Sequence, residues 1–254
     1  MKILLTTVAG MSSRFSASIG RECLKCLYYE HSVEESMLFR MLTRERKFDK
    51  YIIVGGYRFD DLCDFIDLHF SKLRDQIILL KNDHFNELGS GYSFFIGLQE
   101  AVKFKFDELI FAEGDLYIDN KSFNELYDIK SNVITFTFEP ITAQKSVIFY
   151  FNKYWEINYI YDTAHGCLEI HEPFVSIYNS GQVWKFVDYH KVRILLQELS
   201  ADQWFGTNLI PIQQYFGQLT TDEYNIFPIL NWVNCNTVED FKSIQKGEYY
   251  AEHK

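Results

Sequence analysis

The chain has 254 residues, of which 47% are hydrophobic and 17% aromatic, and its formal net charge is −10. A chain of this size and apolar content can bury a large core, so we expect a single domain over residues 1–254. The negative charge argues against nucleic acid as a partner, because binding to a phosphate backbone requires a basic face. The five cysteines are an odd number, which argues against a disulfide framework.

The apolar segments bear on where the protein resides. Only Met1 and Lys2 precede the apolar opening at 3–5, which is too short for a signal peptide. No later window reaches the roughly 18 apolar residues that a membrane span needs. We therefore expect a cytoplasmic protein with no membrane partner.

The first half alternates short apolar runs with amphipathic stretches, the pattern of a mostly parallel sheet flanked by helices. Strands are predicted at 2–8, 51–54, 76–80 and 108–112. Helices are predicted at 33–46, 60–70 and 91–102, from apolar residues that recur at helical spacing. The last of these strands leads into Glu113, Gly114 and Asp115, so two carboxylates follow its carboxyl end.

From residue 132 the pattern becomes β-rich, with predicted strands at 133–138, 146–151, 156–161 and 174–178. A long helix is expected over 182–199, and a final helix after Thr237, a good N-cap followed by Glu239 and Asp240 in the first turn. These segments predict a smaller antiparallel extension built onto the first half.

The loop after the first strand carries the strongest chemical signal, and its residues are Val8, Ala9, Gly10, Met11, Ser12, Ser13 and Arg14. Small residues between a strand and a helix let backbone N–H groups approach an anion closely. The loop lacks the Gly-Lys-Ser/Thr of a Walker A motif and the three glycines of GxGxxG, so alone it is equally consistent with an ordinary turn. Lys25 adds a second cation, which suits phosphoryl or nucleotidyl transfer because charge develops on phosphate oxygens.

Several segments in one order together resemble the nucleotidyltransferases of sugar phosphates and phosphocholine. They are the loop with Lys25, then 52–57 (IIVGGY), 82–86 with 89–93, 111–115 (FAEGD) and 236–241 (NTVEDF). The resemblance covers nearly the whole chain, and the shared order is more specific than any single motif. It implies an α/β fold with a mostly parallel Rossmann-like (GT-A-type) sheet, a nucleotide-binding half at about 1–130 and an acceptor-binding half at about 131–254.

The resemblance also implies roles for individual residues. Lys25, Arg14 and Asp115 would be catalytic, with Asp115 holding Mg²⁺ and Asn236 beside it. Besides the loop residues, the nucleotide would contact Gly56, Tyr57, Asn86, Ser90, Gly91, Tyr92, Ser93 and Glu113. The acceptor would contact residues drawn from Tyr117, Glu139, Lys145, Asn179, Gly181, Trp204 and Asn208, where 178–181 is similar to the family's NxG turn before a helix.

The metal site departs from the family pattern. Phosphocholine-type members carry two carboxylates before the last helix, where this chain has Asn234 and Asn236. An amide oxygen can still serve a hard cation, so Asp115 remains the one clear charged protein ligand. Cys23 and Cys26 form a CxxC pair, but a structural zinc site needs two further ligands, and we expect none.

The length and the compact second half favour a cytidylyltransferase that uses CTP and a small phosphorylated acceptor and releases pyrophosphate. The loop and the aromatic second half are most similar to the capsule-modifying cytidylyltransferases that act on phosphoglutamine and give CDP-glutamine. Phosphocholine and a sugar 1-phosphate remain alternative acceptors. The lightly charged metal site leaves open a non-catalytic nucleotide-binding regulator, and a homodimer is compatible with the resemblance.

Overall fold

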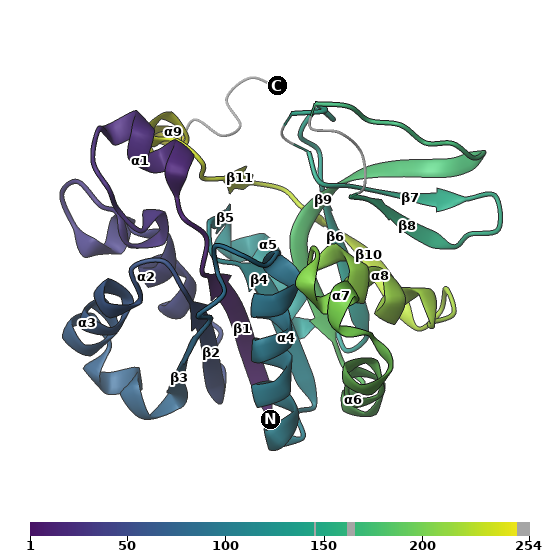
Figure 1. The fold of residues 1–254 in the computed structure, drawn as a ribbon, viewed down its shortest axis with the longest axis horizontal. Helices are drawn as coiled ribbons and strands as arrows, with labels where there is room; N and C mark the ends of the chain where they lie inside the picture. The colour runs from purple at the N-terminus through teal and green to yellow at the C-terminus, as the bar shows by residue number, and fades with distance from the viewer. Residues whose placement is uncertain (145, 162–165, 248–254) are drawn as a thin grey trace.

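The computed structural model describes residues 1–144, 146–161 and 166–247 (Figure 1). Within these ranges a nine-stranded sheet has the order β10-β6-β9-β4-β1-β2-β3, and in addition β7 pairs with β9 and β8 pairs with β7. Its strands are β1 (Lys2–Val8), β2 (Lys50–Gly55), β3 (Ile77–Lys81), β4 (Glu108–Glu113), β6 (Asn132–Thr137), β7 (Ile148–Asn152), β8 (Ile157–Ile160), β9 (Phe174–Phe186) and β10 (Tyr224–Ile229). A separate ladder pairs β5 (Leu116–Ile118) with β11 (Trp232–Asn234).

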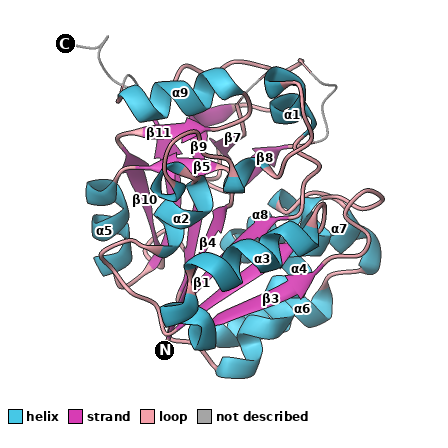
Figure 2. Cartoon of the chain, turned by 90° about the vertical axis from the view of Figure 1, so that its left-hand side faces the viewer, coloured by secondary structure: helices cyan, strands magenta, loops and turns pink. Residues whose placement is uncertain are grey.

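Helices lie on both sides of the sheet (Figure 2). They are α1 (Ser13–Ile19), α2 (Met37–Leu42), α3 (Phe59–His69), α4 (Ser90–Ala101), α5 (Asn120–Asp128), α6 (Tyr189–Glu198), α7 (Ala201–Phe205), α8 (Leu209–Gly217) and α9 (Val238–Lys246). Short 3-10 turns occur at η1 (Lys25–Leu27), η2 (Val33–Glu35), η3 (Ser71–Gln76) and η4 (Val102–Phe104). No helix in the described ranges is long and apolar enough to cross a membrane.

Strand β1 lies between β2 and β4 and is parallel to both, with Leu4 opposite Tyr51 on one side and Ile110 on the other. Strand β9 is antiparallel to β4 and β6, and the β7–β8 hairpin extends from it at the right of Figure 1. The predicted fold class, a mostly parallel sheet with a smaller antiparallel extension, is confirmed. In such open sheets ligands bind at the carboxyl ends of strands that diverge to opposite sides, as β1 and β4 do here.

Alternate residues of the central strands enter two different cores. Leu4 and Ile110 face the core that α2, α3, α5 and α9 complete, whereas Leu5 and Phe111 face the core that α4, α6, α7 and α8 complete. Both faces of these strands are therefore covered, which is why their sequences are continuous apolar runs rather than alternating ones.

The helix predicted at 182–199 is wrong at its start. Residues 182–186 belong to β9, and the helix, α6, begins only at Tyr189. Val183, Trp184 and Phe186 are fully buried, and pairing with two flanking strands outweighs the local helical spacing. The turn expected at 178–181 is likewise strand, with an irregularity in its pairing to β6 and a φ of 54° at Gln182.

The helix predicted at 33–46 is two shorter elements, η2 and α2. Ser36 separates them because its backbone is extended and its side chain accepts a hydrogen bond from the Phe39 amide at 3.3 Å, which starts α2. The predicted buried face is confirmed, since Met37, Leu38 and Met41 are all core residues. Seven further elements, β5, β10, β11, α1, α5, α7 and α8, are not predicted from the sequence.

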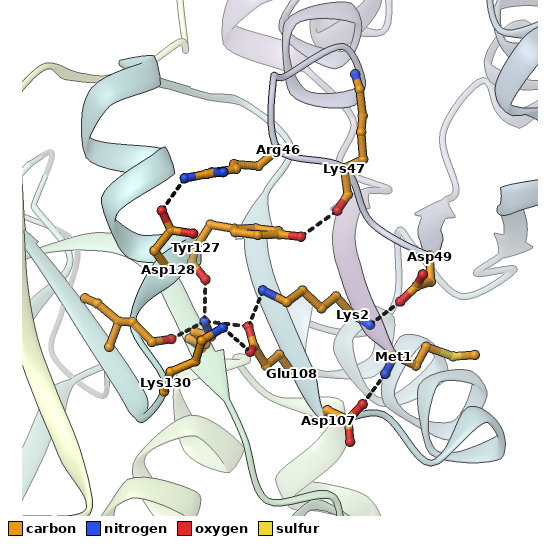
Figure 3. A network of polar contacts seen from close by, with 12 residues as sticks. Met1, Lys2, Arg46, Lys47, Asp49, Asp107, Glu108, Tyr127, Asp128 and Lys130 are labelled. Carbon is orange, nitrogen blue, oxygen red and sulfur yellow. Dashed lines mark hydrogen bonds and ion pairs between the residues drawn. The ribbon is translucent and has the colours of Figure 1, made fainter.

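A charged network ties the strands together at the end opposite the carboxyl ends of β1 and β4 (Figure 3). The Nζ of the fully buried Lys185 lies 2.8 Å from Glu108 Oε2, and Lys2 Nζ lies 3.0 Å from the same oxygen. Lys130 Nζ lies 3.0 Å from Oε1. Burial alone would raise the pKa of Glu108, but these three ammonium groups outweigh it and lower the pKa to about 2.

We expect Glu108→Gln to lower the free energy of unfolding by about 3 kcal/mol at pH 7, because it leaves Lys185 buried without its anion. The folded pKa lies below the ordinary 4.5, so the ionised carboxylate stabilises fully above that pH. The stabilisation is lost as the pH falls toward 2, and the difference from wild type should shrink accordingly. Urea unfolding at pH 7 and pH 3 measures this. Lys130→Met, which removes an exposed partner of the same carboxylate, should cost under about 1 kcal/mol; equal costs for the two variants would contradict the account.

Candidate active site

The loop that follows β1 is held to the next segment through Ser12. Ser12 has a φ of 55°, a conformation that is uncommon for residues other than glycine. Its side chain makes no cap hydrogen bond to α1. Instead, Ser12 Oγ accepts a hydrogen bond from the Lys25 amide at 3.1 Å. The Ser12 side chain therefore fixes where the Lys25 backbone lies.

Four of the predicted site residues meet at one point, although they come from four distant segments. Lys25 Nζ lies 2.5 Å from Asp115 Oδ2 and 3.0 Å from Asn236 Oδ1. Arg14 Nη2 donates to the same Asn236 oxygen at 2.9 Å. Two cations, a carboxylate and an amide oxygen thus face one another at the carboxyl ends of β1 and β4.

The backbone around Asp115 holds it against the loop and against β11. The Gly114 amide donates to Thr7 O at 3.1 Å, and the Cys235 amide donates to Asp115 O at 2.9 Å. Gly114 is needed there, since a Cβ would lie 2.2 Å from Val8 Cγ1 and 2.9 Å from Thr7 O. The missed β5–β11 ladder is therefore the element that brings Asn236 to Asp115.

Asn234 and Asn236, which stand where carboxylates were expected, act as a pair. Asn236 Nδ2 donates to Asn234 Oδ1 at 2.8 Å, which leaves Asn236 Oδ1 to face Arg14 and Lys25. The backbone N–H of Asn236 donates to Asp240 Oδ2 at 3.0 Å, so the start of α9 fixes the position of Asn236. The predicted N-cap of that helix is confirmed, because Thr237 and Asp240 form a capping box.

Asp115 Oδ1 is buried and has no hydrogen-bond partner within the described residues. A buried carboxylate oxygen without a donor is costly unless a cation or a ligand satisfies it. Asp115 and the Asn236 amide supply the oxygen ligands that Mg²⁺ prefers. The oxygen donors of the site therefore fit the expected Mg²⁺.

Two adjoining cavities open at this point and share Ser12 and Lys25. The carboxylate cavity, of about 210 Å³, is lined by Thr7, Val8, Gly10, Ser12, Leu24, Lys25, Cys26, Ser90, Glu113, Gly114 and Asp115. The guanidinium cavity, of about 250 Å³, is lined by Met11, Ser12, Ser13, Arg14, Phe15, Lys25 and Asn236. The loop predicted from sequence thus separates a space with two acids from a space with cations.

Glu113 is braced in the carboxylate cavity by residues from two other segments. Asn208 Nδ2 donates to Glu113 Oε1 at 2.9 Å, and Ser90 Oγ donates to Asn208 Oδ1 at 3.1 Å. Burial, and next the nearby charge of Asp115, raise the pKa of Glu113 to about 7 against the opposing effect of Asn208. Ser90 and Asn208, expected in different subsites, therefore belong to one network.

Most other predicted nucleotide contacts line neither cavity. Ser93 is buried and accepts from Asn82 Nδ2 at 2.9 Å. Tyr92 lies between the rings of His84 and Phe205. Close packing accounts for Gly56 and Gly91, where a Cβ would lie 2.5 Å from Phe85 Cβ and 2.7 Å from Trp204 O respectively, and Tyr57 and the exposed Asn86 also lie outside both linings.

Among the acceptor candidates, the Asn208 side chain makes hydrogen bonds to Glu113 and Ser90, which line the carboxylate cavity. Trp204 is 3% exposed and packs on Phe95, and Gly181 O accepts from Trp232 Nε1 at 2.9 Å within the fold. The side-chain amide of Asn179 donates a hydrogen bond to the Glu139 carbonyl, and the Tyr117 ring lies beside Arg40. Lys145 lies outside the described residues.

The sequence analysis missed Thr7, Leu24 and Cys26 as cavity-lining residues. Leu24 and Cys26 flank Lys25, so their place follows once Lys25 is known to enter the site. No disulfide joins cysteines of the described residues. Within the described ranges no three His, Cys, Asp or Glu side chains lie close enough to hold a metal ion together.

Solved structures that share this fold include nucleotidyltransferases. The inositol-1-phosphate CTP transferase from T. maritima is 14% identical with a TM-score of 0.64, covering 100% of this chain and 98% of that one. The CTP:phosphocholine cytidylyltransferase from Streptococcus pneumoniae is 11% identical with a TM-score of 0.56, covering 97% and 99%. HddC from Yersinia pseudotuberculosis, complexed with GMP-PN, is 14% identical with a TM-score of 0.58, covering 97% and 100%.

By sequence, the chain belongs to the family described as a domain of unknown function, DUF6564, whose model matches residues 21–248. No curated protein gives a significant match. At the identities of the solved structures the likeness shows a shared fold, and the chemistry of the site has to be argued from this chain's own residues.

We expect Gly89→Ala to destabilise the fold by about 2 kcal/mol, because overpacking against backbone cannot relax easily. A Cβ at Gly89 would lie 2.1 Å from Gly206 O, where the Gly89 amide now donates to Phe205 O at 2.7 Å. Urea unfolding measures the change. Gly217→Ala is the matched control, since nothing lies within 4 Å of its Cβ and alanine favours the helix. If both variants are as stable as wild type, α4 does not pack tightly against the α7–α8 loop.

Proposed function

We propose that this protein is a Mg²⁺-dependent cytidylyltransferase that transfers CMP from CTP to a small phosphorylated acceptor and releases pyrophosphate. The observation that carries the proposal is the meeting of Lys25, Arg14, Asn236 and Asp115 at the carboxyl ends of β1 and β4. The shared fold of the nucleotidyltransferases named above supports it.

The two cations of the site would bind the nucleotide phosphates and accelerate the transfer of CMP. Arg14 presents a planar fork to the guanidinium cavity, which suits bidentate contact with phosphate oxygens. Lys25 lines both cavities and so lies where the α-phosphate would join the two parts of the nucleotide. There it would stabilise the charge that develops as the acceptor phosphate attacks. No general base is required, because a phosphate monoester is already an anionic nucleophile near neutral pH.

The acidic part of the site would hold the metal ion. Asp115, through its partnerless Oδ1, and the Asn236 amide would bind Mg²⁺, which when bound neutralises charge on the transferring phosphoryl group. Asp115 is the one charged ligand among these, so the affinity for the ion depends strongly on the nucleotide phosphates.

The ion pair between Lys25 and Asp115 couples the two binding events. Lys25 is to bind phosphate and Asp115 is to bind metal, yet in this structure they are bound to each other at 2.5 Å. Lys25, once drawn to a nucleotide phosphate, would leave Asp115 available to hold the metal, and Asp115, once engaged with the metal, would leave Lys25 available for phosphate. The two ligands should therefore bind cooperatively.

For the acceptor we propose phosphoglutamine, which would give CDP-glutamine for capsule modification. The support is the sequence resemblance of the loop at 6–15 and of the aromatic second half. Phosphocholine and a sugar 1-phosphate are the alternative acceptors, and each would give a different CDP conjugate. Supplying each acceptor separately in the assay described next distinguishes them.

The proposal is tested by pyrophosphate release from the four common nucleoside triphosphates with each acceptor. Wild type should turn over CTP with one acceptor, and Asp115→Asn should be slower by about two orders of magnitude or more, as loss of a metal ligand predicts. Asp222→Asn, an exposed turn residue, is the control and should match wild type. CTP binding without turnover of any acceptor would instead support a non-catalytic regulator.

We expect opposite effects of Lys25→Met on two measurements. Removing the competing ammonium should tighten Mn²⁺ binding in the absence of nucleotide by roughly tenfold, because a nearby like charge contributes on the order of a kcal/mol or more. Turnover should fall by about 100-fold, as for the loss of one electrostatic donor. Titration calorimetry and the pyrophosphate assay measure these. Unchanged Mn²⁺ binding would show that the ion pair does not compete with the metal. Lys121→Met, on the exposed side of α5, should change neither quantity.

A further inference from the structure

One acid in the carboxylate cavity has no role in the chemistry above. Glu113 is not needed to bind phosphate, which its charge would repel, and Asp115 is the residue whose orphan oxygen suits the metal. Yet the Glu113 carboxylate is held in place by a buried partner. Its Oε1 accepts from Asn208 Nδ2 at 2.9 Å, and Asn208 is 3% exposed.

The brace leaves the second carboxylate oxygen for a ligand. Asn208 and Ser90 are joined by two hydrogen bonds. The backbone N–H of Asn208 donates to Ser90 Oγ at 3.1 Å, and Ser90 Oγ donates to Asn208 Oδ1 at 3.1 Å. Within the described residues Glu113 Oε2 receives no hydrogen bond, and Glu113 lines the cavity. Glu113 is partly buried, and a carboxylate in such a position is stabilised when a donor reaches it. Segments from β4, α4 and the start of α8 thus aim an unsatisfied acceptor at a substrate.

The two cavities divide the substrates by charge. Arg14 and Asn236 line the guanidinium cavity, which suits the phosphates of the nucleotide. The carboxylate cavity, with Glu113 beside apolar walls such as Val8 and Leu24, suits an uncharged or cationic part. Lys25 lines both, so the part that enters the carboxylate cavity lies next to the reacting phosphate.

We propose that Glu113 is a specificity-determining residue that accepts a hydrogen bond from an amino group of the substrate, with Asn208 as its positioning residue. The inference rests on the proposed function. In its ionised form the Glu113 carboxyl group can only accept, so it binds an N–H₂ or ammonium group and repels a carbonyl oxygen at the same place. The amino group has two sources: the exocyclic amine of cytosine, which uracil lacks, or an amino group of the acceptor.

The first arm of the test measures CTP and UTP binding by calorimetry without acceptor, in wild type and Glu113→Gln. If the base supplies the amine, wild type should prefer CTP by about tenfold or more, as for a carboxylate paired with the cytosine amine. Glu113→Gln should lose this preference, because its amide can donate to the uracil O4. Glu113→Asp keeps the negative charge, but its shorter side chain places the carboxylate farther from the ligand. This variant should lose the preference for CTP in part. Asn208→Leu should weaken the preference without abolishing nucleotide binding.

The second arm compares kcat/KM for a phosphorylated acceptor that bears an amino group with that for a matched acceptor that lacks it. If the acceptor supplies the amine, Glu113→Gln should reduce this ratio at least fivefold while the CTP to UTP ratio is unchanged. Glu125→Gln, on the exposed face of α5, is the control for both arms and should change neither ratio.

The inference is overturned if both ratios in Glu113→Gln stay within twofold of wild type while wild type turns over. That result would leave the proposed function intact. A wild-type protein that binds no nucleotide would overturn the proposed function, and this inference with it.

Discussion

The ion pair between Lys25 and Asp115 is the contact around which the site is organised. Its two atoms are 2.5 Å apart and both side chains are mostly buried, so their charges can only be tolerated together. To bring them there, Ser12 holds η1 against the loop, Gly114 holds the end of β4 against β1, and the β5–β11 ladder brings Asn236 alongside. The cost of separating these charges is what ligands must compensate, which makes the pair a natural point of control.

The two ends of β4 show how one strand serves stability at one end and chemistry at the other. Glu108 at its start is met by three ammonium groups, and its pKa falls to about 2. At its end Glu113 lies beside Asp115 with no cation of its own, and its pKa rises to about 7. The fully paired charge of Glu108 holds the strands together, whereas the incompletely paired carboxylate of Glu113 is suited to binding a ligand.

Much of the fold follows from apolar patterning, but strand pairing does not. The runs that form β1, β2 and β4 are continuous because both sheet faces are covered, and they were recognised for that reason. Local spacing predicts a helix at 182–186, yet this segment is the end of β9 and pairs with β4 on one side and β6 on the other. Long-range partners of this kind leave little trace in local spacing, and the short strands β5 and β11 were missed for the same reason.

The chemical groups of the site can be read from the sequence: a small-residue loop after a strand, Arg14 and Lys25 behind it, and Asp115 after a second strand. These features are visible because residue type and spacing are local properties. The tertiary structure sets which residues share a cavity. It joined Glu113 to Asn208 and Ser90, and it packed Trp204 and Gly181 away from both cavities, because contacts across a sheet depend on register and crossover rather than on position along the chain.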